Sequence, residues 1–438
     1  MSINRSYSFL QRHLLTMMVL LQLVWLGGVW LTGASASPQK LFPLFVYSLM
    51  VGLVFLFFPG FFAGWLIRLE AYLAQNERRL LLILSLTMLI IGLVYAHYQR
   101  IWPWDEENSY QASLLVAEGG VTALLDEYMA NPWLGAQHPP LMIMLYGSTM
   151  RLFGQDIFVV RSVGVFMGVG VLLLTYWLGR ELYNPLNGFL AAAFLLSFPL
   201  FLRQSATAMT DVPVTFFFSL ALLLTWRLLH HPSFGLTLSV AAVIGIGILI
   251  KYTMVFIYPV LVALAFFSPS FKHIRRYLAI ILLLPMLLGL VWLVLAQNFG
   301  ILAGQIGTLG SYITVMGRSE EARQFLYESF TTRLPTAVGV YNIPLIALGG
   351  YYLLRRQGEA EQFLFWQLGV VWLVLTVTIP DHRYFMLTFP AVAILIARGL
   401  TTYTPTLKER ALALSLLYGL GALYLFVDWL RTAHLFIS

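Results

Sequence analysis

The sequence contains no cysteine, and only 10% of its 438 residues are charged. Without cysteine the chain has no disulfide, no iron-sulfur cluster and no cysteine nucleophile, so a bound metal would need histidine and carboxylate ligands. Soluble domains usually carry about 25% charged residues. Here 60% of the residues are hydrophobic, which predicts an integral membrane protein.

The net charge of +7 comes from 26 Lys and Arg residues against 19 Asp and Glu residues. The basic residues stand in short clusters between apolar runs, a pattern typical of membrane topology rather than of nucleic-acid binding. We therefore expect membrane lipids, and no nucleic acid, among the partners.

Apolar runs near the length of about 20 residues needed to cross a bilayer recur along the chain. They predict an all-α polytopic protein with about 13 transmembrane helices. The predicted spans are 14–33, 42–67, 80–97, 158–178, 187–203, 212–229, 234–250, 252–268, 277–296, 334–354, 362–379, 384–400 and 410–429. This pattern divides the chain into an N-terminal pair of helices (1–79), a core (80–400) and a C-terminal helix (401–438).

The first span has one alternative interpretation, a signal peptide. Arg5 and Arg12 precede it, and Ala34-Ser35-Ala36 resembles a cleavage site. The apolar stretch is longer than the usual signal-peptide core, which favours a transmembrane helix.

Placing the N-terminus in the cytoplasm puts most basic residues in cytoplasmic loops, as the positive-inside rule requires. Lys272, Arg275 and Arg276 are the densest of these clusters. Most carboxylates then fall on the other side. We therefore expect a multi-pass plasma (inner) membrane protein whose polar chemistry faces outward.

Two outer segments, 98–157 and 297–333, are longer than connections need to be. In the first, residues 108–129 carry apolar side chains at helical spacing, and 139–153 form an apolar run of only about 22 Å as a helix. Both predict interfacial helices rather than spans. In the second, a glycine-rich stretch precedes an amphipathic pattern at 320–328. This segment either closes over the lipid donor or is an ordinary flexible outer loop with a surface helix.

Candidate chemistry begins where the third span emerges. Asp105 and Glu106 follow Trp102-Pro103-Trp104 at the membrane surface, a placement that suits a general base. Acids after a span are also commonly just the solvated start of a loop.

Polar residues also occur at two other places that we expect on the outer side of the membrane. His138 precedes two prolines that stiffen its backbone, so it is either a metal or phosphate ligand or a turn residue. Arg203 and Asp211 lie in one short connection, where Asp211 is either a ligand or the cap of the next helix.

Lys251 stands between two apolar runs, and Arg383 precedes another. Charges near a membrane boundary are costly unless they are used or snorkel to the interface, so both interpretations stay open. Together with Arg161 and Arg203, these cations map to one face. A face that carries both cations and carboxylates has the residue types expected of a site that binds a lipid-linked phosphate.

The order of these motifs resembles a known family. The motifs are the acids after a span, His138-Pro-Pro-Leu, Arg161-Ser-Val-Gly-Val, Arg203 with Thr210-Asp211, Lys251-Tyr252, and Arg383-Tyr384 with Pro390. Over about 80–400 this order resembles the dolichyl-phosphate-mannose protein mannosyltransferases and the bacterial aminoarabinose transferases. These families share the membrane-embedded glycosyltransferase C fold.

The resemblance implies an inverting transferase that moves a sugar from a polyprenyl-phosphate carrier to a hydroxyl of a protein, lipid or glycan. Asp105 matches the acid that activates the acceptor, with Glu106 as the neighbouring catalytic candidate. His138 and Asp211 match positions that hold a divalent metal, although the first is a glutamate in the aminoarabinose transferases. The implied ligands of the donor phosphate are Arg161, Arg203, Lys251, Arg383 and Tyr384.

Two other classes of protein would also fit this pattern of spans and charges. A lipid or solute transporter or flippase also has many spans, but it usually carries ionisable residues at mid-membrane and paired repeats. A structural subunit with a decayed transferase fold is the other alternative, which the intact Asp105, His138 and Asp211 argue against.

Overall fold

The computed structural model describes residues 63–130, 138–298, 328–339, 342–377 and 381–403. Within these ranges the regular structure is helical, without a strand. The predicted spans 14–33 and 410–429, most of 42–67, and the amphipathic pattern at 320–328 lie outside them. The divisions at 1–79 and 401–438 therefore stay predictions.

The predicted all-helical fold is confirmed in the described part of the chain. Five helices there are long and apolar enough to cross a membrane, or six if one bent pair counts as a span. The five are the Gln75–Tyr98 part of α3 (Ala63–Tyr98), α7 (Ile157–Leu182), α10 (Asp211–His230), the Arg275–Trp292 part of α13 (Arg275–Asn298) and the run Tyr384–Thr402. Two further helices are α11 (Phe234–Ile250), which is apolar but shorter, and α18 (Glu359–Val377). The total of 13 spans stays a prediction.

Several predicted spans are interrupted. The span predicted at 187–203 is two helices, α8 (Pro185–Leu196) and α9 (Pro199–Ser205), bent by 73°. Pro199 causes the break, because proline lacks an N–H donor and pushes the preceding residue out of helical conformation. Phe198 has the expected extended backbone, at φ −83° and ψ 113°.

Three other predicted spans begin with a short element and continue as a longer helix. At 252–268 a 3₁₀ turn, η1 (Tyr252–Phe256), precedes α12 (Ile257–Phe267), and at 384–400 η5 (Tyr384–Thr388) precedes α19 (Phe389–Tyr403). At 334–354, α16 (Leu334–Val338) and α17 (Ile343–Arg355) are separated by Gly339, whose φ is +82°. Two remaining turns are η2 (Pro269–Ile274) and the π-helical η3 (Ser329–Arg333).

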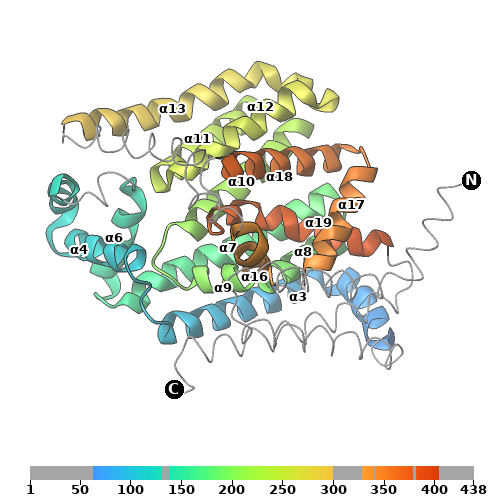
Figure 1. Cartoon of the computed structure of the whole chain (residues 1–438), viewed down its shortest axis with the longest axis horizontal. Helices are drawn as coiled ribbons and strands as arrows, with labels where there is room; N and C mark the ends of the chain where they lie inside the picture. The colour runs from blue at the N-terminus through green and yellow to red at the C-terminus, as the bar shows by residue number, and fades with distance from the viewer. Residues whose placement is uncertain (1–62, 131–137, 299–327, 340–341, 378–380, 404–438) are drawn as a thin grey trace, which may run out of the picture.

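The helices form one bundle, with α7 packed against α3, α8 and α10 (Figure 1). Next to α10, α11 packs against α13. The first outer segment contributes α4 (Asp105–Ala130) and α6 (Leu141–Phe153), which pack on each other at one end of the bundle (Figure 1, left). These are the two regions where interfacial helices were expected, and α4 is broken at Gly120, whose φ is +77°.

Helix α7 makes a close backbone contact with the end of α9 and the connection that follows it. A Cβ added to Gly164 of α7 would lie 2.8 Å from the carbonyl oxygen of Ser205 and 2.9 Å from that of Thr207. Small residues allow such backbone contact between membrane helices. The connection at 206–210 is therefore held directly against α7.

We expect Gly164→Ala to lower the free energy of unfolding by about 1–3 kcal/mol, because the new methyl group has to displace backbone. The matched control is Gly369→Ala in α18, where an added Cβ meets nothing within 4 Å. Melting temperatures of the purified variants in detergent measure the difference. Equal melting temperatures for the two variants would contradict this packing.

Candidate functional site

A strained turn starts helix α4 and separates its two acids. Trp104 has a φ of +70°, a conformation that is rare for a residue with a side chain. The N–H of Asp105 donates to the carbonyl of Pro103 at 3.1 Å, and that of Asn108 donates to Trp104 at 2.9 Å. Successive helical residues point about 100° apart, so Asp105 and its neighbour face different surroundings.

Glu106 forms a buried, two-pronged ion pair with Arg161. Arg161 Nε donates to Glu106 Oε1 at 2.7 Å, and a terminal guanidinium nitrogen donates to Oε2 at 2.9 Å. Each oxygen accepts a second hydrogen bond, one from the N–H of Ala208 at 2.9 Å and one from the N–H of Trp102 at 2.6 Å. The carboxylate is thus fully occupied inside the protein.

Arg161 is equally engaged, since its remaining nitrogen donates to the carbonyls of Ala96 at 3.0 Å and Gln99 at 2.7 Å. The exposed fractions of the Glu106 and Arg161 side chains are 0% and 1%. This geometry favours a positioning role for both. It argues against the catalytic role predicted for Glu106 and the phosphate contact predicted for Arg161.

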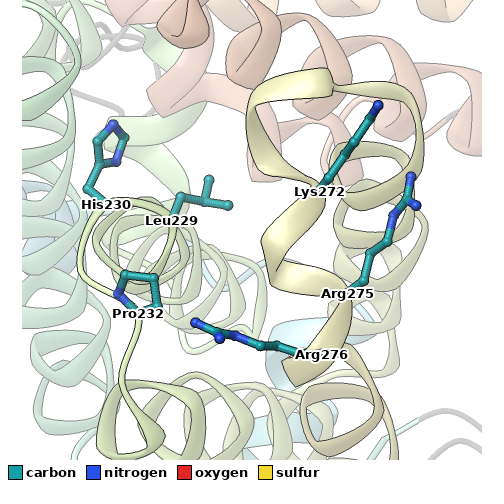
Figure 2. Close-up of a pocket in the computed structure, with 6 residues that line it drawn as sticks. All are labelled: Leu229, His230, Pro232, Lys272, Arg275 and Arg276. Atoms are coloured by element: carbon teal, nitrogen blue, oxygen red, sulfur yellow. The ribbon is translucent and has the colours of Figure 1, made fainter.

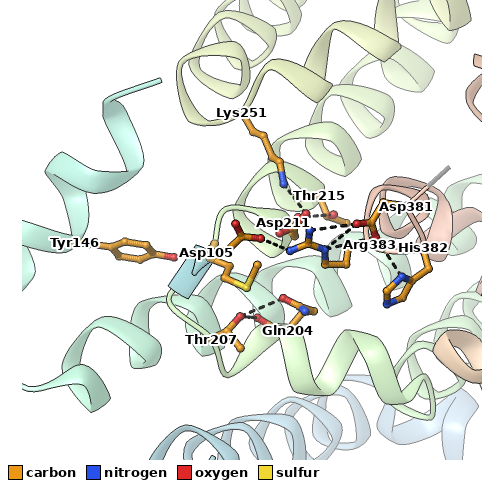
Figure 3. A network of polar contacts seen from close by, with 11 residues as sticks. Asp105, Tyr146, Gln204, Thr207, Asp211, Thr215, Lys251, Asp381, His382 and Arg383 are labelled. Carbon is orange, nitrogen blue, oxygen red and sulfur yellow. Dashed lines mark hydrogen bonds and ion pairs between the residues drawn. The ribbon is translucent and has the colours of Figure 1, made fainter. Parts of the chain in front are cut away.

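Asp105 faces a different, more open cluster. Its Oδ2 lies 2.5 Å from Arg383, and Arg383 also pairs with Asp381 at 3.1 Å (Figure 3). The Asp105 side chain is 30% exposed, which leaves the carboxylate accessible. Burial would raise the pKa of Asp381, but the hydrogen bond from His382 and the charge of Arg383 outweigh it and hold this pKa well below its usual range.

Asp211 and Lys251 form a further ion pair of the cluster. Lys251 Nζ donates to Asp211 Oδ1 at 2.6 Å, and its charge lies 4.7 Å from the centre of the Tyr384 ring. Thr210 is the N-cap of α10 and Asp211 its first residue, without a side-chain capping bond. The geometry therefore favours a ligand role for Asp211 over the alternative of a helix cap.

Asp211 also carries an unused acceptor. Its Oδ2 is buried and has no hydrogen-bond partner among the described residues. An unsatisfied buried carboxylate oxygen costs free energy, so sites of this kind usually receive a ligand or water.

His138 lies near both ion pairs. Burial, together with the positive charge of Lys251, lowers its pKa from 6.5 to about 4, while Asp105 and Asp211 oppose the shift. The imidazole is therefore neutral at physiological pH and can accept a hydrogen bond. Its backbone is fixed by Tyr128, whose hydroxyl donates to the His138 carbonyl at 2.7 Å.

Arg203 stacks its guanidinium over Trp102, 4.9 Å from the ring centre, next to the start of α4. Contacts of Lys251 with Asp211 and Tyr384, and of Arg383 with Asp105, bring together residues that are far apart in the sequence. Asp381 was missed as a site residue by the sequence analysis. Its position two residues before Arg383 was the available signal, since i and i+2 groups meet readily in a turn.

The described residues do not by themselves fit a divalent metal. No group of three or more His, Asp or Glu side chains in the described ranges is close enough to hold one. At Asp211, the ammonium of Lys251 already binds one oxygen. The metal at His138 and Asp211 therefore stays a prediction from the resemblance, and no chemical step is assigned to it.

Comparisons with known proteins agree with this architecture. The sequence model of the dolichyl-phosphate-mannose-protein mannosyltransferase family matches residues 137–294. Undecaprenyl phosphate-α-4-amino-4-deoxy-L-arabinose arabinosyl transferases from Pseudomonas paraeruginosa and Pseudomonas aeruginosa are 29% and 28% identical to this chain. Each match covers 48% of this chain but only 39% of the relative.

Solved structures show the same fold at low sequence identity. ArnT from Cupriavidus metallidurans, bound to undecaprenyl phosphate, has a TM-score of 0.61 at 14% identity, covering 78% of this chain and 64% of that one. This chain has the glycosyltransferase C fold. The apo oligosaccharyltransferase of Archaeoglobus fulgidus gives a TM-score of 0.52 at 15% identity, covering 80% of this chain and 56% of that one.

Within this glycosyltransferase C fold, neighbouring acids should respond differently to loss of charge. We expect Glu106→Gln to destabilise the protein by about 3–5 kcal/mol, because it leaves the buried Arg161 charge unpaired. Asp105→Asn should cost about 1 kcal/mol or less, because that pair is partly exposed to solvent. Melting temperatures measured side by side test this, and an Asp105→Asn variant that melts lower than Glu106→Gln would reverse the two roles.

Proposed function

We propose that this protein transfers a sugar from a polyprenyl-phosphate donor to an acceptor hydroxyl of a protein, lipid or glycan. The observation that carries the proposal is the accessible Asp105 carboxylate beside Arg383 in a glycosyltransferase C fold. The curated relatives are arabinosyl transferases, and the ArnT structure holds undecaprenyl phosphate. The Archaeoglobus fulgidus oligosaccharyltransferase has also been solved with dolichol-phosphate, at a TM-score of 0.50 and 13% identity.

Asp105 acts as the general base in this proposal. The acceptor hydroxyl hydrogen-bonds to its carboxylate, and its oxygen attacks the anomeric carbon from the side opposite the phosphate. The new carbon–oxygen bond forms as the bond to the phosphate oxygen breaks, with inversion. The hydroxyl proton passes to Asp105.

The cations stabilise the leaving group. Breaking the sugar–phosphate bond adds negative charge to the polyprenyl phosphate, and a phosphate leaving group needs charge stabilisation rather than a proton. Lys251, Arg203 and Arg383 are the cations around the site, with Tyr384 under the Lys251 ammonium. Positive groups already in place act without reorganisation at the transition state.

Arg383 links the binding of the donor phosphate to the state of the base Asp105. In this structure it neutralises both Asp105 and Asp381. A donor phosphate that takes over the guanidinium would release the Asp105 carboxylate to accept the acceptor hydroxyl. The base would then become available when the donor is present.

The alternative of a transporter or flippase receives no support from the comparisons, which match transferases. The charges argue the same way, because Asp105, Asp211 and Lys251 stand at the ends of helices rather than along them.

We expect Asp105→Asn to lower transfer at least about 100-fold, because general-base catalysis typically contributes 10²–10⁴-fold. The wild-type protein is first assayed with a panel of undecaprenyl-phosphate sugars to find the active donor. Release of undecaprenyl phosphate from that donor is then measured for each variant. Asp156→Asn is the matched control, because Asp156 is the N-cap of α7 and asparagine caps equally well. Activity of Asp105→Asn within about tenfold of wild type would contradict the role of Asp105.

The orientation of the site is a separate proposal. We place the N-terminus in the cytoplasm and the Asp105 cluster on the outer face of a plasma membrane, from the distribution of Lys and Arg. Because the chain has no cysteine, single cysteines at the exposed positions Gln155 and Arg356 can be labelled individually. An impermeant maleimide added to intact cells should label position 155 and spare position 356, and the opposite pattern would overturn the orientation.

A further inference from the structure

A basic pocket lies at the end of helix α10 that is remote from Asp211. It has a volume of about 630 Å³ and is lined by Leu229, His230, Pro232, Lys272, Arg275 and Arg276 (Figure 2). The 20 residues of α10 span about 30 Å, the thickness of the hydrocarbon core. The pocket and the Asp105 cluster therefore lie at opposite boundaries of the membrane.

The three cations of the pocket have no ion-pair partner in the described part of the chain. Three of its six lining residues are Lys or Arg, and no Asp or Glu lines it. Lys272, Arg275 and Arg276 belong to no ion pair among the described residues. Three like charges this close repel one another, so an anion bound between them would be favoured.

Hydrogen bonds hold Arg275 and His230 at opposite walls of the pocket. Arg275 Nε donates to the carbonyl of Ala265 at 2.8 Å, which ties the start of α13 to the end of α12. His230 at the opposite wall donates from Nδ1 to the Trp226 carbonyl at 2.9 Å, and its Nε2 lies 3.4 Å from Glu359 Oε2. Figure 2 shows the Arg276 side chain extending across the opening toward Pro232.

Exposed apolar side chains follow on the helices next to this charged opening. Phe266 and Phe267, at the end of α12, have exposed fractions of 52% and 67%. Further along α13, Leu283, Met286 and Leu287 are exposed as well. In a membrane these side chains face acyl chains, so a ligand of the pocket that also carries acyl chains contacts both surfaces.

We propose that this pocket binds the phosphate headgroup of an anionic phospholipid at the membrane face opposite the Asp105 cluster. Basic pockets between membrane helices bind such headgroups through their phosphate oxygens. Lys272 and Arg276 contact the phosphate, while Arg275 holds the wall of the pocket. The site is distinct from the donor site and does not rest on the proposed transferase activity.

The test uses the full-length protein in detergent and native mass spectrometry to measure the affinity for phosphatidylglycerol. Lys272→Gln/Arg276→Gln should weaken binding by about tenfold or more, the scale expected for removing two cations next to an anionic headgroup. The matched control is Arg355→Gln/Arg356→Gln, which removes two exposed cations at the end of α17, outside the lining of the pocket. This control should stay within about twofold of wild type.

A conservative variant and a soluble competitor complete the test. Lys272→Arg/Arg276→Lys should keep wild-type affinity, because it retains both charges. Glycerol phosphate at the same concentration should leave the bound phosphatidylglycerol in place. The proposal is overturned if Lys272→Gln/Arg276→Gln binds phosphatidylglycerol as tightly as the control Arg355→Gln/Arg356→Gln. It is also overturned if glycerol phosphate displaces the lipid, which would identify a site for free phosphate.

Discussion

The buried ion pair between Glu106 and Arg161 is the interaction on which the arrangement of the site depends. Through its six hydrogen bonds it joins the end of α3, the turn before α4, helix α7 and the connection after α9. Buried ion pairs often add little net stability, because desolvation offsets the attraction. Here its consequence is geometric, since fixing Glu106 inward turns Asp105 outward to Arg383.

This division explains how two adjacent carboxylates serve different ends. Glu106, with 0% exposure, is saturated by four donors and holds the backbone, whereas Asp105 is 30% exposed and shares the Arg383 guanidinium with Asp381. Strain at Trp104 is consistent with this arrangement, because backbone strain concentrates where a functional side chain is aimed. The pair Lys251–Asp211 then completes the cluster from α10 and α11.

The helical fold could be predicted from the sequence because an apolar run of membrane length is recognised without knowing what it packs against. It missed the break at Pro199 and the turn at Gly339, where single residues interrupt an otherwise apolar run. The grouping of Asp105, Asp211, Lys251 and Arg383 followed from their common boundary. The pairing of Glu106 with Arg161 could not be predicted, because these residues are 55 positions apart and only packing decides which acid turns inward.

In the proposed function, the Asp105 cluster binds the phosphate of a polyprenyl-phosphate donor. A structure of the protein with undecaprenyl phosphate bound tests it most directly. We expect the phosphate within hydrogen-bond distance of Lys251 or Arg383, with Asp105 released from Arg383 on the acceptor side. A phosphate located away from both cations, with the Asp105–Arg383 and Asp211–Lys251 pairs intact, would contradict it.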